Sequence, residues 1–124
     1  MTHVIKECIG RGRIMQEEEL YFEDFYSGQK FNSLRSYRIT TKEIISFGES
    51  YDPQPFHIDV EFSKNWAFEG LIASGLHTMC ATLKLWLELG VFKACSLGSP
   101  GLGETQFPRP VRPGDTINVQ ERWF

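Results

Sequence analysis

The feature that most constrains the fold is an apolar stretch near the middle of the chain, from Leu71 to Leu89. Its apolar residues recur at intervals of three and four, which predicts an α-helix of about twenty residues, or roughly 30 Å, with Gly90 as its stop. The apolar positions are Leu71, Ile72, Leu76, Met79, Cys80, Ala81, Leu83, Leu85, Trp86, Leu87 and Leu89. Because they leave only a narrow polar stripe, something broad has to cover the helix, and a curved sheet is the simplest cover.

Shorter helices are predicted before this one. Thr40 followed three positions later by Glu43 forms a capping box, which predicts a short helix that Gly48 and Pro53 prevent from continuing. Asp59 stands at the N-cap position of a second short helix. Asp59 therefore has a structural role available.

Strands are predicted toward both ends of the chain. The run ending at Ile39 places Phe31, Tyr37 and Ile39 in one parity. Downstream, the run to Phe107 predicts a strand that prolines break, and residues 112–115 predict a turn. From Thr116 to Phe124 mostly apolar and polar residues alternate, as expected of a strand with one buried face.

Length and charge limit the classes of function. A chain of 124 residues with 41% hydrophobic composition forms one domain, which we place at residues 20–124. Residues 1–19 have no clear period and are expected to be a mobile leader, with Met15 as an alternative start. A net charge of -3 without a basic patch argues against nucleic acid or an anionic membrane as a partner. With no signal core or membrane span apparent, a soluble, cytoplasmic protein is expected.

The cysteines and histidines do not predict a metal site. Cys8, Cys80 and Cys95 are odd in number and lack CxxC spacing, so reduced thiols are expected, with Cys80 packed in the core. His57 and Asp59 are only two positions apart, and no further ligand has suitable spacing. We therefore expect no metal.

The sharpest functional signal is Asp52 and His57, held five positions apart in a loop that Pro53 and Pro55 stiffen. Backbone N–H groups at the start of the following apolar helix lie close in sequence to Asp52 and His57. Such a site would move protons beside a polarised carbonyl group. The alternative is a structural hydrogen bond between the two side chains, and His77 has a helix-surface or packing role as its simpler explanation.

Four ordered segments give the chain a resemblance to the MaoC-like dehydratase family, relatives of the (R)-specific enoyl-CoA hydratases. They are Tyr21-Phe-Glu-Asp-Phe25, Tyr51-Asp-Pro-Gln-Pro-Phe-His-Ile-Asp59, Leu71-Ile-Ala-Ser-Gly-Leu-His77 and Pro110-Val-Arg-Pro-Gly-Asp115. The resemblance implies a single α+β hot-dog domain in which a curved antiparallel sheet wraps a long central helix. The family has several strands after the turn at 112–115, of which this sequence holds the first, so the C-terminal strands are expected to be missing. A truncated product, or an edge completed by a partner chain, is therefore expected.

The resemblance also implies a reaction. The family's hydratase motif falls on Asp52, His57 and Ser63, and the first two would activate a water that adds to a trans-2-enoyl thioester, or is lost from a 3-hydroxyacyl thioester. Substrate and oxyanion contacts would come from Pro55, Ser74, Gly75 and Arg112. Arg112 would attract the phosphates of a carrier, but a solvated arginine beside a turn is the commoner case.

The expected partners are an acyl-CoA or acyl carrier protein thioester and a second copy of the chain, as a homodimer or higher oligomer, with no cofactor. Two alternatives stay open: an acyl-CoA thioesterase on the same fold, and a non-catalytic subunit that binds acyl thioesters.

Overall fold

The structure of the chain, a computed structural model, describes residues 20–124. The expected leader at 1–19 and the alternative start at Met15 lie outside the described residues. The helices are a single 3-10 turn η1 (Phe22–Asp24), α1 (Thr41–Tyr51), α2 (Pro55–Ile58), α3 (Val60–Lys64) and α4 (Gly75–Leu87). The strands are β1 (Lys30–Asn32), β2 (Tyr37–Arg38), β3 (Thr116–Ile117) and β4 (Gln120–Arg122).

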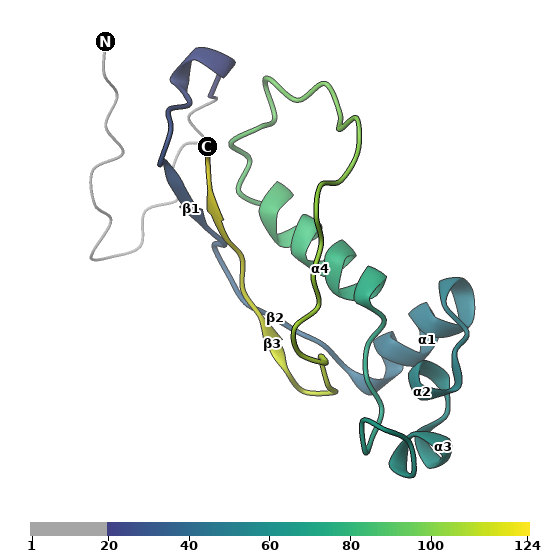
Figure 1. The fold of residues 1–124 in the computed structure, drawn as a ribbon. Helices are drawn as coiled ribbons and strands as arrows, with labels where there is room; N and C mark the ends of the chain where they lie inside the picture. The colour runs from purple at the N-terminus through teal and green to yellow at the C-terminus, as the bar shows by residue number, and fades with distance from the viewer. Residues whose placement is uncertain (1–19) are drawn as a thin grey trace, which may run out of the picture.

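The strands form two antiparallel pairs, β1 with β4 and β2 with β3. Figure 1 shows the two pairs following one another along a single extended ribbon, with α4 beside it and α1–α3 gathered at the β2–β3 end. At the junction, Ser33 N donates to Val119 O at 2.8 Å, and Val119 N donates to Ser33 Oγ at 3.1 Å. A side-chain oxygen thus takes the place of a ladder acceptor, which interrupts the sheet. The α+β architecture with a central helix is the one predicted.

The core occupies two places along the ribbon. Near α1, the buried side chains of Ile39, Ile44, Leu71 and Ala73 form one cluster. At the other end, aromatic rings pack together, among them Trp86 and Phe92, whose centroids are 4.0 Å apart. The remaining rings of this cluster are Phe25, Phe31 and Trp123. Between the two places, α4 buries His77, Ala81 and Leu85, which are spaced four residues apart on one face.

Helix α4 is shorter than predicted. It begins at Gly75 instead of Leu71, because residues 71–73 are extended and bond to other segments: Ile72 N donates to Phe56 O and Ala73 N to Val111 O. These residues are buried all the same. A buried extended segment and a buried helix have the same apolar composition. The apolar pattern therefore could not show where the segment ends and the helix begins. At its other end α4 stops at Leu87, before the predicted end at Leu89, and Gly90, at φ +73, ends the turn that follows.

The predicted packing of Cys80 in the core is wrong. Cys80 is exposed, and Leu76, Leu83 and Leu87 are each more than half exposed. Ala81 and Leu85 are buried on one face of α4, and Cys80 lies off that face. Within residues 20–124, no other element buries this side of the helix.

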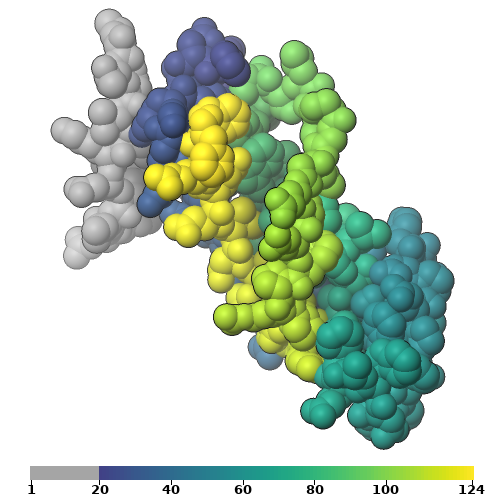
Figure 2. Space-filling view, in the orientation of Figure 1, coloured from purple at the N-terminus to yellow at the C-terminus, as the bar shows by residue number. Residues whose placement is uncertain are grey.

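The strand predicted up to Phe107 is also wrong. Residues 97–110 are exposed and belong to no strand, and Figure 2 shows this light green segment as a ridge across the molecule. Prolines at 108 and 110 lack the N–H group that a ladder needs, and glycines weaken a strand. The alternation predicted from Thr116 is confirmed, because Val119 is buried and the residues on either side of it are exposed. It is divided between β3 and β4.

Both predicted helix caps are confirmed. Thr40 Oγ1 accepts from Glu43 N, and the Glu43 carboxylate accepts from Thr40 N at 2.9 Å. Asp59 Oδ1 accepts from Phe62 N at 2.9 Å at the start of α3. The first helix differs in one respect, since α1 continues through Gly48 to Tyr51. Among the described helices, none has the length and apolar character needed to span a membrane.

Candidate active site

The structure brings Asp52 and His57 together where α1 and α2 meet. Asp52 is the C-cap residue of α1, and Pro55 at the first position of α2 starts the turn that carries His57. His57 Nε2 lies 3.3 Å from Asp52 Oδ2. The imidazole is buried, whereas the Asp52 side chain keeps 21% of its surface exposed. The pair is thus held rigidly on one side and reachable on the other.

A backbone carbonyl orients the imidazole. His57 Nδ1 is 2.8 Å from Ile72 O. Since a carbonyl oxygen only accepts, Nδ1 carries a hydrogen, and Nε2 is the ring atom that gains or loses a proton. The exchangeable position therefore faces the Asp52 carboxylate. A single proton can pass between Nε2 and Oδ2 without any movement of the ring.

Two further groups hold the Asp52 carboxylate. Ser74 Oγ donates to Oδ2 at 2.7 Å, and Gln54 Nε2 donates to Oδ1 at 2.8 Å. The hydrogen bonds from Ser74 and Gln54, with a smaller effect of His57, lower the pKa of Asp52, although burial opposes them. Asp52 is therefore ionised at neutral pH, ready to accept a proton from a bound water.

Gly48 allows the two helices to approach. A Cβ at this position would lie 2.7 Å from Ile58 Cγ2 and 3.2 Å from His57 Cβ. Gly48 O also accepts from Asp52 N at 2.9 Å, so this residue lies against both members of the pair. From the sequence, Gly48 is predicted only to stop a helix. Its positioning role arises from a contact between helices that spacing does not reveal.

Ser74 links the start of α4 to the pair. It is buried, and as the N-cap residue its hydroxyl accepts from Leu76 N at 3.2 Å while donating to Asp52. The next residue, Gly75, is the first of α4, and its backbone N–H donates to no acceptor among residues 20–124. An N–H donor thus follows directly after a residue bonded to the carboxylate.

The space beside Gly75 is taken by an aromatic ring. A Cβ on Gly75 would lie 2.7–3.0 Å from three carbons of the Phe107 ring. Glycine at this position therefore lets the phenyl ring pack against the first turn of α4. Phe107 follows Gly75 by thirty-two positions in the chain, and the sequence held no signal that would pair them.

Other predicted site residues are engaged elsewhere. Arg112 Nη2 donates to Phe68 O at 2.5 Å, so its guanidinium binds the segment after α3. Ser63 is buried in α3 and donates to Asp59 O, and no hydrogen bond joins it to Asp52 or His57 in the described chain. Pro55 is exposed and adjoins the pair through α2.

His77 lies one helical turn beyond Ser74. Its ring stacks on Phe47 of α1, with centroids 4.7 Å apart and an interplanar angle of 5°. Burial lowers the pKa of His77, with the charge of Glu43 acting weakly in the opposite direction. Its Nδ1 is buried without a hydrogen-bond partner among the described residues. His77 is therefore a packing residue between α4 and α1, and no three potential metal ligands gather anywhere in residues 20–124.

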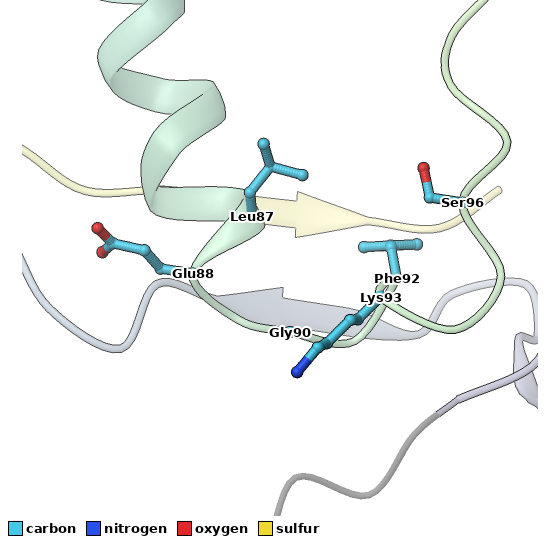
Figure 3. Close-up of a pocket in the computed structure, with 6 residues that line it drawn as sticks. All are labelled: Leu87, Glu88, Gly90, Phe92, Lys93 and Ser96. Atoms are coloured by element: carbon cyan, nitrogen blue, oxygen red, sulfur yellow. The ribbon is translucent and has the colours of Figure 1, made fainter.

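A surface pocket lies at the opposite end of α4. Figure 3 shows its lining residues, Leu87, Glu88, Gly90, Phe92, Lys93 and Ser96. Because Ser74 caps the N-terminal end of α4 and this pocket adjoins the C-terminal end, the length of the helix, about 20 Å, separates them. The pocket is not part of the candidate site.

A central helix beside antiparallel strands is the arrangement of an α+β hot-dog domain. In this chain the Asp52–His57 pair is joined to the start of that helix through Ser74. A family model described as "MaoC like domain" matches residues 24–123, and the chain belongs to that family. This confirms the resemblance drawn from the four sequence segments.

Individual relatives agree with the family. An uncharacterized Bacillus subtilis protein, YdeM, is 32% identical over 95 residues, covering 77% of this chain and 67% of YdeM. A MaoC-like dehydratase from Rhodospirillum rubrum is 36% identical with a TM-score of 0.66, over 82% of this chain and 68% of that one. An (R)-hydratase from A. caviae involved in PHA biosynthesis is 27% identical with a TM-score of 0.54, over 81% and 73%. At the level of the family, the reaction class is hydration or dehydration.

Proposed function

We propose that this protein adds water to a trans-2-enoyl thioester, or removes it from the corresponding 3-hydroxyacyl thioester. The observation that carries the proposal is the environment of Asp52 Oδ2, which has Ser74 Oγ at 2.7 Å and His57 Nε2 at 3.3 Å. A carboxylate that is ionised, partly exposed and adjacent to an exchangeable imidazole nitrogen suits the activation of water, and such general acid–base catalysis contributes typically about 10²–10⁴-fold.

In the direction of hydration, a water bound between Asp52 and His57 attacks the β-carbon of the enoyl group. The water oxygen forms the new bond to that carbon, and one water proton passes to Asp52. The π electrons move toward the thioester oxygen, and the α-carbon then takes the proton of His57 Nε2. Transfer of a proton from Asp52 to Nε2 across the 3.3 Å contact restores both groups.

Stabilisation of the thioester oxygen is assigned to the N–H of Gly75. Charge builds on this oxygen as the enolate forms, and a fixed backbone donor facing it lowers the barrier. Ser74 acts through Asp52, because its hydroxyl proton is directed at the carboxylate. Arg112 is proposed to contact the phosphates of the carrier through donors other than the Nη2 group that Phe68 O binds.

The carrier is proposed to be coenzyme A or acyl carrier protein, and the working form a homodimer or higher oligomer. The experiment that tests the reaction is incubation of the purified protein with crotonyl-CoA, with the products identified by mass spectrometry and free thiol measured in parallel. Gain of one water without thiol release supports the proposal. Release of free coenzyme A would identify a thioesterase, and saturable binding without any product would identify a non-catalytic binding subunit.

A further inference from the structure

The packing of Phe107 on Gly75 places an aromatic ring beside the proposed oxyanion donor. A Cβ on Gly75 would come within 2.7 Å of the ring, so the ring lies against the Cα itself. The N–H assigned to the thioester oxygen is one covalent bond from that Cα. A thioester bound there is therefore a neighbour of the ring.

The ring does not belong to the hydrophobic core. Phe107 is 53% exposed, and every residue from 97 to 110 is exposed. In Figure 2 the segment runs over the surface of the molecule as a ridge. Carbons of the phenyl ring thus contact α4 at Gly75, while about half of the residue remains open to solvent. Such a side chain can shape a binding site without being needed to hold the fold.

We propose that Phe107 is a specificity-determining residue that limits which substituents the acyl α-carbon carries. The inference rests on the proposed function, because it takes the thioester oxygen to be bound at Gly75. The α-carbon is attached directly to the thioester carbonyl, so its substituents are the part of the acyl group nearest the bound oxygen. A methyl branch at that carbon competes with the ring for space, whereas the distant end of an acyl chain does not.

The test compares two thioesters, crotonyl-CoA and its α-methyl-branched homologue 2-methylcrotonyl-CoA. The parent protein should prefer the unbranched substrate, and Phe107→Ala should shift the ratio of the two kcat/KM values toward the branched one by about 10-fold, the lower end of what one methyl group is worth against a hydrophobic wall. Because both values are measured on one preparation, a loss of folded protein cancels from the ratio.

Two further variants keep the test decisive. Leu102→Ala removes a side chain that is 76% exposed on the same segment, and the ratio should not change. Phe107→Leu keeps much of the volume and should give an intermediate shift, and it replaces Phe107→Ala if that variant does not fold. An unchanged ratio in folded Phe107 variants that turn over both substrates would overturn the role of Phe107 but not the proposed function. A parent that hydrates neither thioester would overturn the proposed function and this inference with it.

Discussion

The hydroxyl of Ser74 donates a 2.7 Å hydrogen bond to Asp52 Oδ2, joining two residues that are 22 positions apart in the chain. The same hydroxyl caps α4 by accepting from Leu76 N. One side chain therefore sets both the start of the central helix and the ionisation of the proposed base. Any movement of the helix start is transmitted to the carboxylate.

Replacing Ser74 by alanine should affect stability and the pH profile together. Loss of an N-cap and of a buried hydrogen bond to a carboxylate should lower the free energy of unfolding by about 1–3 kcal/mol. The Ser74 bond is the main cause of the lowered pKa of Asp52, so the acid limb of activity should move to higher pH. Denaturant unfolding and a kcat/KM–pH profile measure the two effects.

The matched control for that variant is Ser50→Ala. Ser50 is exposed on α1, and its hydroxyl donates to Ser46 O within the helix. Its removal should leave both measurements unchanged. An acid limb that stays in place in folded Ser74→Ala would contradict the electrostatic role of Ser74.

Gly48→Ala should destabilise the protein, against the usual preference of a helix. Alanine is better than glycine inside a helix by about 1 kcal/mol, but here the added methyl group would lie 2.7 Å from Ile58 Cγ2. Separation of α1 from α2 should cost about 1–3 kcal/mol, as overpacking does, and should lower kcat/KM by displacing His57. Thermal unfolding and steady-state kinetics test this.

The double variant Gly48→Ala/Ile58→Ala separates this clash from other effects. It removes the methyl group that alanine meets, so the two substitutions should be less costly together than the sum of the single ones. Gly101→Ala is the control, because nothing lies within 4 Å of its Cβ position. Additive effects of the pair would rule out the steric explanation.

Gly75→Ala and Phe107→Ala should be coupled in stability. An alanine at the start of α4 pushes the Phe107 ring away, whereas in the Phe107→Ala background it meets no ring. Because Phe107 is 53% exposed and only part of its ring contacts α4, we expect a modest coupling free energy of about 0.5–1 kcal/mol. A double-mutant cycle of unfolding free energies measures it. A coupling of zero would mean that the ring does not rest on Gly75 in solution.

His77 should make the protein less stable in mild acid. Its pKa in the folded chain is lowered from 6.5 by burial, so below that value the unfolded chain binds more protons than the folded one. This contribution to stability is complete above pH 6.5 and is lost as the pH falls, by at most about 1.4 kcal/mol for each pH unit. His77→Phe retains a ring against Phe47 and should flatten this part of the unfolding free energy–pH curve. If the curve of His77→Phe runs parallel to that of the parent, the loss of stability in mild acid does not come from His77.

Local signals in the sequence predicted their structures well. Thr40 with Glu43, and Asp59 with Phe62, form caps whose partners lie three positions apart, so spacing alone identified them. The alternation from Thr116 succeeded because the period of a strand has the same short range. The family resemblance supplied the hot-dog fold and drew attention to Asp52 and His57, and the structure brings those two side chains together.

The contacts that complete the site escaped prediction because they are not local. Ile72 O orients His57 from fifteen positions away, and Phe107 reaches Gly75 through an irregular segment with no periodicity. Gln54 is the exception, because an amide two positions after a carboxylate is close enough in sequence to bind it. Arg112 was expected at a carrier, and in the structure its guanidinium binds Phe68 O.

The measurement that tests the central claim most directly is the rate of loss of enoyl absorbance from crotonyl-CoA in Asp52→Asn, compared with the parent and Asp59→Asn. Asn keeps the shape of Asp52 but cannot take a proton, whereas at Asp59 it still caps α3. We expect a fall in kcat/KM of about 10²–10⁴-fold for Asp52→Asn and near-parent activity for Asp59→Asn. Turnover that persists at the parent rate in folded Asp52→Asn would show that this carboxylate is not the base.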